Sequence, residues 1–148
     1  MTPNVRVAST DDALECQRLE SSARNETAGA RGAEAFFAQH PTAFFEGDSD
    51  GDGFSLVAEL EGVVVGYATV AIAVEAQTRV ALLTRVYVTP KARRIGVGDA
   101  LIVAAQATSR SRACGRLDAL ALPGDRDTKN LFERNGLTAR LIIASRSL

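Results

Sequence analysis

The clearest hydrophobic pattern in the chain is a pair of apolar, β-branched segments on either side of a two-residue turn. Residues 54–60 and residues 63–75 flank Glu61-Gly62, an arrangement that is typical of a β-hairpin. The apolar residues 80–88 extend the hairpin into a three-stranded meander whose last strand suits a buried, central position. Near the N-terminus, the alternating residues 5–7 predict one more strand.

Segments with helical periodicity fill the intervals before and after this meander. Residues 10–12 form a good N-cap region for a helix from residue 13 to about residue 23, and a second helix is expected over residues 33–39. After the meander, the pattern predicts a helix from Gly98 to about Arg112, a strand from Leu117 to Leu122, a helix from residues 125–127 to Gly136, and a final strand from Leu141 to Ser145. This order places an antiparallel meander before a crossover helix and a parallel strand, which predicts a mixed sheet with helices on its faces.

Length and composition limit the kinds of protein that this chain can be. Its 148 residues, 46% of them hydrophobic and 24% charged, fit one domain spanning residues 1–148. The net charge of −1 gives no general reason to expect a nucleic-acid or membrane partner. Two cysteines make no disulfide or metal framework and the N-terminus shows no signal sequence, so we expect a cytoplasmic protein with reduced thiols.

A basic loop with two glycines carries the strongest chemical signal. The strand that ends at Val86-Tyr87-Val88 leads into Arg93-Arg94-Ile95-Gly96-Val97-Gly98, where a helix opens. Such a unit brings unpaired N–H groups and the positive end of a helix dipole to one point, which suits a phosphate or pyrophosphate. The glycines allow close backbone approach to an anion, and the arginines add positive charge. An ordinary strand-to-helix connection, whose glycines only relieve strain, is the alternative.

The full pattern, Arg-x-x-Gly-x-Gly five residues after a Val-x-Val strand end, resembles the acetyl-coenzyme A signature of the GNAT superfamily of N-acetyltransferases. A second segment, Leu131-Phe132-Glu133-Arg134-Asn135-Gly136-Leu137, is similar to a later signature of that family, and the resemblance covers nearly the whole chain. It implies an α/β (α+β) fold with a mixed, mostly antiparallel central sheet, helices on both faces, and central parallel strands that splay apart to hold acetyl-CoA.

The resemblance also implies where acetyl-CoA lies and what reaction follows. The backbone of Val86 and Val88 would hydrogen-bond the pantetheine amides, and the amides from Arg94 to Asp99 would hold the pyrophosphate. The expected reaction is direct transfer of the acetyl group to the primary amine of a small molecule or peptide, with a base to present the neutral amine. The implied cofactor-binding residues are Val86, Val88, Arg93, Arg94, Ile95, Gly96, Val97, Gly98, Asp99 and Phe132.

Two departures from the family's pattern leave the catalytic residues open. Phe132 stands where the family usually has a tyrosine acid. Residues 81–88 contain no carboxylate, and Thr84 and Arg85 occupy the positions where relatives often place a glutamate. Candidate bases elsewhere are Glu75, Glu59 and an aspartate of the loop 47–53. A protein with this fold but without turnover, serving as an acyl-CoA sensor or interaction module, is therefore the alternative function.

Two further patterns bear on metals and partners. Asp48-Ser49-Asp50-Gly51-Asp52-Gly53, followed by Glu59, matches the acidic spacing of an EF-hand calcium loop. A predicted strand takes the place of the helix that such a loop requires, so we expect no metal there and an acidic loop that favours a cationic amine. The chain has one predicted strand after Gly136 where many relatives have two, and the open sheet edge predicts pairing with another copy in a homodimer.

Overall fold

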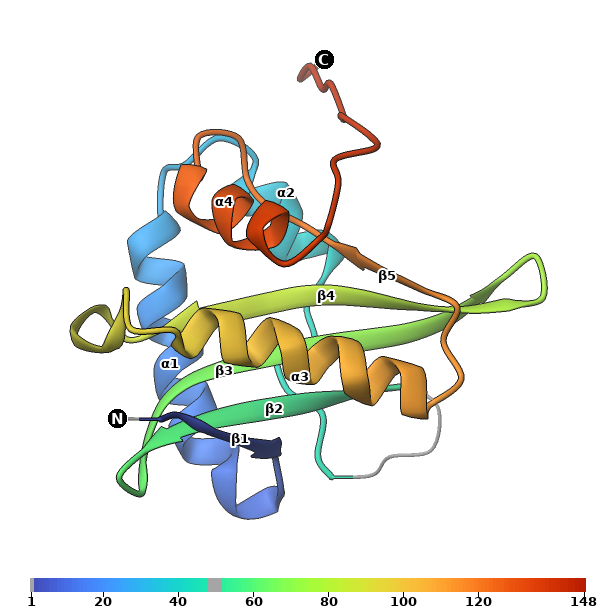
Figure 1. Ribbon diagram of the computed structural model, residues 1–148. Helices are drawn as coiled ribbons and strands as arrows, with labels where there is room; N and C mark the ends of the chain where they lie inside the picture. The colour runs from blue at the N-terminus through green and yellow to red at the C-terminus, as the bar shows by residue number, and fades with distance from the viewer. Residues whose placement is uncertain (1, 48–51) are drawn as a thin grey trace.

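Residues 2–47 and 52–148 are described in the structure, a computed structural model, and their strands form one sheet (Figure 1). Neighbouring strands follow chain order: β1 (Asn4–Val7), β2 (Gly53–Leu60), β3 (Val63–Glu75), β4 (Thr78–Val88) and β5 (Arg116–Ala119). Every pair is antiparallel except β4 and β5, which are parallel. The sheet is therefore mixed and mostly antiparallel, as the sequence predicts.

The α-helices of the described residues pack on both faces of this sheet: α1 (Ala13–Thr27), α2 (Ala33–Gln39), α3 (Val97–Ser111) and α4 (Arg126–Arg134). The helix α3 crosses one face and α1 crosses the other, while α2 and α4 lie on the β5 side (Figure 1). Single turns of 3-10 helix precede α1 (Thr10–Asp12) and follow β4 (Pro90–Ala92). Across residues 2–47 and 52–148, no helix has both the length and the apolar character that crossing a membrane requires.

Successive residues of the central strands build two hydrophobic cores, one on each face of the sheet. Leu56 of β2 packs in the cluster that contains Leu101 and Ile102 of α3. The next residue, Val57, packs in the cluster that contains Leu19 of α1. Side chains alternate between the faces of a strand, so this neighbouring pair of apolar residues holds one helix on each side.

Most predicted elements are present with small changes in their bounds. The helix α1 continues one turn beyond the expected end, to Thr27. The strand β5 ends at Ala119 rather than Leu122, because the N–H of Leu120 makes the last contact to β4, at 3.4 Å from the carbonyl oxygen of Leu83. The chain then leaves the sheet toward α4.

The predicted final strand from Leu141 to Ser145 is wrong for this structure, because residues 137–148 form no helix or strand. This segment meets the sheet at an ion pair between Arg140 and Asp118 of β5 (Nη2–Oδ2, 2.7 Å) and then runs clear of it (Figure 1). Apolar residues form a strand where a neighbouring strand supplies hydrogen-bond partners. In the described part of one copy of the chain, no strand pairs with this segment.

Candidate active site

The strands β4 and β5 separate part-way along β4. Their parallel pairing ends at Leu83 with Ala119, whereas β4 continues to Val88. Thr84, the next residue of β4, is the extra residue of a β-bulge against β3. Because a bulge bends the strand that carries it, β4 leaves β5 at this point and the sheet opens (Figure 1).

Val86 and Val88 direct their backbone groups into the space that β5 leaves. Thr89 donates its N–H to the carbonyl of Val65 on β3, at 2.8 Å. Residues of a strand alternate between its two edges, so Val88 and Val86 point their N–H and C=O groups away from β3. Among the described residues no strand pairs with them on that side. The carbonyl of Val88 accepts instead from Nε of Arg93, at 2.7 Å.

A cavity of about 700 Å³ occupies this opening and extends from α1 and α2, past β4, to the start of α3 and to α4. Of the residues predicted to bind a cofactor, those that line it are Val86, Val88, Arg93, Arg94, Gly96, Gly98 and Asp99. The side chains of the remaining predicted residues point away from it. Val97 and Phe132 are buried in the hydrophobic core, and Ile95 is half exposed at the surface.

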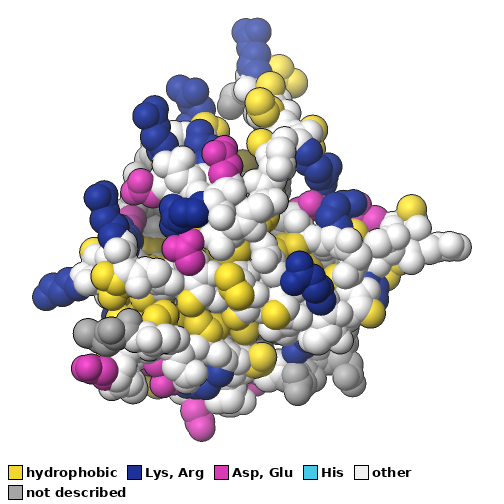
Figure 2. All heavy atoms as spheres, viewed as in Figure 1, with side chains coloured by type: hydrophobic (Ala, Val, Ile, Leu, Met, Phe, Trp, Pro, Cys, Tyr) yellow, Lys and Arg dark blue, Asp and Glu magenta, His cyan; other side chains and the backbone are white. Residues whose placement is uncertain are grey.

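The loop between β4 and α3 forms a basic wall of the cavity, and Figure 2 shows Lys and Arg side chains at the left edge where this loop lies. Arg94 and Gly96 have left-handed backbone conformations, with φ of +64° and +91°, and Gly96 is the N-cap of α3. A Cβ at Gly96 would meet no atom within 4 Å. In the described part of the chain, the N–H groups of residues 94–98 have no acceptor and Arg94 is in no ion pair. This wall therefore offers free donors at the positive end of a helix, as an anion requires.

Asp99, in the first turn of α3, brings a negative charge to the same wall. Arg134 of α4 donates to it from Nε at 2.9 Å, and Asn135 donates from Nδ2 at 2.9 Å. The hydrogen bond from Arg134 outweighs the effect of burial and lowers the pKa of Asp99. Arg134 therefore compensates the charge of Asp99. The same two hydrogen bonds hold α4 against α3.

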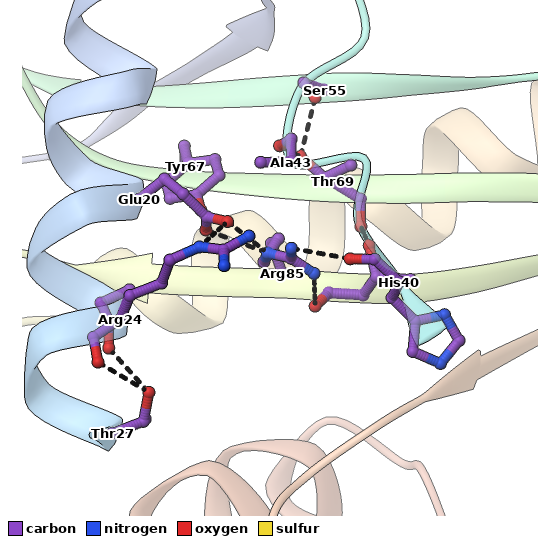
Figure 3. Close-up of polar contacts among 11 residues, drawn as sticks. Glu20, Arg24, Thr27, His40, Ala43, Ser55, Tyr67, Thr69 and Arg85 are labelled. Atoms are coloured by element: carbon purple, nitrogen blue, oxygen red, sulfur yellow. Dashed lines mark hydrogen bonds and ion pairs between the residues drawn. The ribbon is translucent and has the colours of Figure 1, made fainter. Parts of the chain in front are cut away.

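On the opposite wall, Arg85 of β4 lines the cavity and forms a buried ion pair with Glu20 of α1, which lies behind the lining (Figure 3). Nε of Arg85 donates to both carboxylate oxygens of Glu20, at 2.9 and 3.1 Å. Nη2 of Arg85 donates to the carbonyl of His40 at 2.8 Å, and its guanidinium lies 4.9 Å from the ring centroid of Phe37. Arg85 thereby joins α1, α2 and β4 directly below the bulge.

Tyr67 completes this network, because its hydroxyl also donates to Glu20. Burial acts to raise the pKa of Glu20, but the hydrogen bonds from Arg85 and Tyr67 outweigh it and hold that pKa below its ordinary value. Burial, followed by the bond to Glu20, raises the pKa of Tyr67. Glu20 is thus a carboxylate and Tyr67 a phenol at neutral pH.

A second charged cluster on this side of the cavity is more exposed than the first. Glu26 of α1 accepts from the hydroxyl of Tyr87 at 2.6 Å and from Nη2 of Arg93 at 2.8 Å. Burial acts to raise the pKa of Glu26, but these two hydrogen bonds outweigh it and lower the pKa. All three residues line the cavity, so the cluster joins α1 to the end of β4 and to the basic loop.

Glu59 and Glu75, two of the bases suggested by the sequence, lie away from this cavity. Glu59 pairs with Arg6 of β1 at 2.6 Å, and Glu75 pairs with Arg116 of β5 at 3.0 Å; neither lines the cavity. Residues 48–51 of the EF-hand-like pattern lie outside the described residues. The segment that follows them is the strand β2, as the sequence predicts, and in the described residues no three potential ligands gather to hold a metal ion.

The sequence pattern does not point to Glu20 or Glu26, because their partners on β4 lie 65 and 61 residues away. One local signal exists for Glu20. It lies at helical spacing from Cys16 and next to Leu19 on the buried stripe of α1, where an ionised carboxylate requires a partner. No comparable signal marks Glu26.

Comparison with known families identifies what this arrangement resembles. The profile of the Acetyltransferase (GNAT) family matches residues 15–137, which is most of the chain. No curated protein shows significant sequence similarity to the chain.

Solved structures share the fold over almost the whole chain. A ribosomal-protein-alanine N-acetyltransferase from Brucella melitensis biovar Abortus 2308 is 21% identical, with a TM-score of 0.73 and coverage of 99% of both chains. An acetyltransferase from Trypanosoma brucei is 22% identical, with a TM-score of 0.71 and coverage of 99% of this chain and 100% of that one. The aminoglycoside N-acetyltransferase AAC(6′)-Iy, in complex with CoA, is 18% identical, with a TM-score of 0.71 and coverage of 98% and 100%.

Proposed function

Because the chain belongs to the GNAT family of acetyltransferases, we propose that it transfers an acetyl group from acetyl-CoA to a primary amine. The observation that carries this proposal is the opening between β4 and β5, which leads to the free N–H groups at the start of α3. One end of this opening suits a pyrophosphate, and its length along β4 suits an extended amide chain.

The basic loop fits the phosphates of the cofactor. The N–H groups of residues 94–98 would bind the pyrophosphate oxygens, and Arg94 would compensate their charge. Gly96 presents an open side on which a side chain would obstruct this approach. Arg93 already has Glu26 as a partner, so we assign it to holding the loop as well as to adding charge.

The free edge of β4 fits the pantetheine arm. Val86 and Val88 would pair with its amides as a further strand does, which satisfies backbone groups that β5 leaves without partners. Acetyl-CoA would supply the acetyl group as a thioester at the end of this arm, and the N–H of Val86 is the donor best placed to polarise its carbonyl.

Direct transfer to the acceptor is favoured over an acetylated enzyme. Neither cysteine lines the cavity, and burial raises the pKa of Cys16 to about 12, so that thiol is not ionised at neutral pH. Phe132 carries no proton for the departing thiolate. A thiol of pKa about 8.5 leaves without protonation near neutral pH, so the reaction does not depend on an acid at that position.

The acceptor would enter from the side of α1 and α2. Glu26 lies in this wall and stays ionised because its pKa is lowered, but Arg93 and Tyr87 already bind its carboxylate, so it adds little net charge for the acceptor. The structural neighbours include one enzyme named for ribosomal-protein alanine and one named for aminoglycosides. We therefore propose a positively charged small molecule or a peptide N-terminus as the acceptor class.

An acyl-CoA-binding protein without turnover is the second candidate. Phe132 in place of a tyrosine favours it, as does the engagement of Glu20 and Glu26 in hydrogen bonds to the protein's own arginines. Both functions require the same cofactor site, so they differ in turnover alone.

A thiol-release assay separates these functions. The chain is incubated with acetyl-CoA and a panel of amines that contains an aminoglycoside, a polyamine and an alanine-initiated peptide, with each amine's N-acetylated form as its matched control. Release of CoA that requires the free amine supports the enzyme. Cofactor binding without release for any amine supports the silent protein, and absence of both results contradicts the proposal.

A further inference from the structure

Arg93 makes a contact that competes with the cofactor-binding mode proposed above. Its Nε donates to the carbonyl of Val88 at 2.7 Å. That carbonyl lies on the edge of β4 that faces away from β3, where no strand pairs with it among the described residues. A pantetheine arm that pairs with β4 as an added strand needs the same carbonyl as an acceptor. Arg93 therefore occupies part of the edge that we assign to acetyl-CoA.

The ion pair between Arg93 and Glu26 of α1 is one that the protein can exchange. Nη2 of Arg93 lies 2.8 Å from the carboxylate, and the two side chains are 41% and 40% exposed. Water and salt screen a pair as exposed as this, so it contributes little stability. The pair of Arg85 with Glu20 differs, because those side chains are 4% and 9% exposed and neither charge can be left there without a partner.

A pyrophosphate at the start of α3 would offer Arg93 a stronger partner than a carboxylate. Arg93 lines the cavity and directly precedes residues 94–98, whose N–H groups have no acceptor in the described chain. A guanidinium binds phosphate oxygens through parallel charge-assisted hydrogen bonds. Movement of Arg93 to the pyrophosphate would release the carbonyl of Val88 and would also take the cation away from Glu26.

Tyr87 would keep Glu26 in position after this exchange. Its hydroxyl donates to Glu26 at 2.6 Å, and it lies on β4 between the two residues assigned to the pantetheine arm. Within the part of the chain that the structure describes, no other Lys or Arg pairs with Glu26. A partly buried carboxylate that has lost its cation attracts another one, and the protonated amine of an acceptor is such a cation.

We propose that Arg93 and Glu26 form a latch, which acetyl-CoA opens by drawing Arg93 away from Val88 and Glu26. Glu26 then binds the ammonium form of the acceptor amine. The latch rests on the proposed function, since it requires that acetyl-CoA uses the edge of β4. It couples the two ligands, so each one raises the affinity of the protein for the other.

Calorimetric titration with CoA tests the latch by the sign of a change in affinity. Glu26→Gln breaks the pair, and we expect this variant to bind CoA about threefold more tightly than the unmodified protein. The matched control is Glu75→Gln, which removes the same charge from an exposed pair with Arg116 outside the cavity and should leave the affinity unchanged. Weaker binding by Glu26→Gln would show that the pair only holds the loop for the cofactor. Either that result or an unchanged affinity overturns the latch.

Arg93→Met separates the latch from the simple loss of a negative charge. The pair is already absent in this variant, so the addition of Glu26→Gln should alter CoA affinity little. An equal gain in affinity with and without Arg93 would assign the whole effect to charge and overturn the latch. Absence of CoA binding to the unmodified, folded protein would instead overturn the proposed function, and the latch with it.

Titration with amines tests the role of Glu26 toward the acceptor. The aminoglycoside, the polyamine and the alanine-initiated peptide are each titrated into the protein with and without saturating CoA. We expect at least one of them to bind about threefold more tightly when CoA is present. Glu26→Gln should lose this gain, and Glu75→Gln should keep it. No gain for any of the three amines, or a gain that persists in Glu26→Gln, overturns the proposal.

Discussion

The two walls of the cavity differ in how their polar groups are satisfied. On the α3 side, the N–H groups of residues 94–98 have no acceptor in the described chain and Arg94 has no ion-pair partner there. On the α1–α2 side, Glu20, Arg85 and Glu26 are bound to one another or to neighbouring groups. The first wall keeps its donors for a ligand, whereas the second uses its charges to hold three elements of the fold in place.

This difference separates two kinds of mutational effect, one for the basic wall of residues 93–99 (the loop wall) and one for the wall that contains Arg85 (the buried wall). A change in the loop wall should weaken cofactor binding and leave the free energy of unfolding nearly unchanged, apart from local strain. A change in the buried wall should lower the free energy of unfolding first. The following variants test that separation, starting with the largest expected effect.

Arg85→Met removes the cation that compensates Glu20 in the buried wall. We expect the free energy of unfolding to fall by about 3–5 kcal/mol, because the variant leaves a buried carboxylate without its ion-pair partner. Urea denaturation measures the change. The double variant Glu20→Leu with Arg85→Met removes both charges, and it should regain most of the lost stability. An Arg85→Met protein as stable as the original would contradict the role given to this pair.

Gly96→Val places a branched side chain on the open side of the basic loop. We expect acetyl-CoA affinity to fall roughly 30-fold, or about 2 kcal/mol, because the residue keeps a strained positive φ and obstructs the pyrophosphate. Calorimetric titration measures the affinity. Gly62→Val is the matched control, since Gly62 has φ of +81° and open space around its Cβ but lies in the β2–β3 turn. Equal loss of affinity in both variants would place the pyrophosphate elsewhere.

Arg94→Glu reverses the charge that has no partner in the described part of the loop wall. We expect about a tenfold loss of cofactor affinity, or about 1.4 kcal/mol, and a smaller loss at high salt because ions screen exposed charges. Arg110→Glu, an exposed arginine at the other end of α3, gives the same change in net charge and should leave affinity nearly unaltered. If both variants weaken binding equally, general charge rather than this position explains the effect.

Glu26→Gln has the smallest expected effect, which is a change in the pKa of Tyr87. Glu26 joins the two walls, because it binds both Tyr87 of β4 and Arg93 of the basic loop. Burial and then the bond to Glu26 raise the pKa of Tyr87, so removal of the carboxylate charge should lower that pKa toward its ordinary value. Ultraviolet titration of the phenols measures it, because the chain has only two tyrosines and no tryptophan. Burial and the bond to Glu20 raise the pKa of Tyr67, so the phenol that ionises first is assigned to Tyr87. An unchanged titration would show that Tyr87 does not interact with Glu26.

The same contrast explains why the sequence predicts one wall of the cavity and not the other. The loop wall lies in one contiguous stretch, and its strand end, glycines and helix start leave a local pattern from which its geometry can be predicted. In the buried wall, Arg85 contacts Glu20 and His40, which lie 65 and 45 positions earlier in the sequence. No local periodicity predicts such distant pairs. The meander was predictable for the same reason as the loop, because Glu61-Gly62 and the flanking apolar segments specify a hairpin locally.

The final strand fails as a prediction for a different physical reason. Composition shows that residues 141–145 favour an extended conformation, but it does not show whether a partner edge is within reach. For Phe132, the sequence predicts a cofactor contact from its place in the second signature, and that contact stays a prediction. The structure adds that its side chain lies in the core cluster.

Calorimetric titration of the unmodified protein with acetyl-CoA tests the central claim most directly. The account predicts saturable binding of one cofactor per chain that weakens as salt concentration rises, because the basic loop supplies free donors and charge. Absence of acetyl-CoA binding to a protein that circular dichroism shows to be folded would contradict this claim. The basic loop would then only connect β4 to α3.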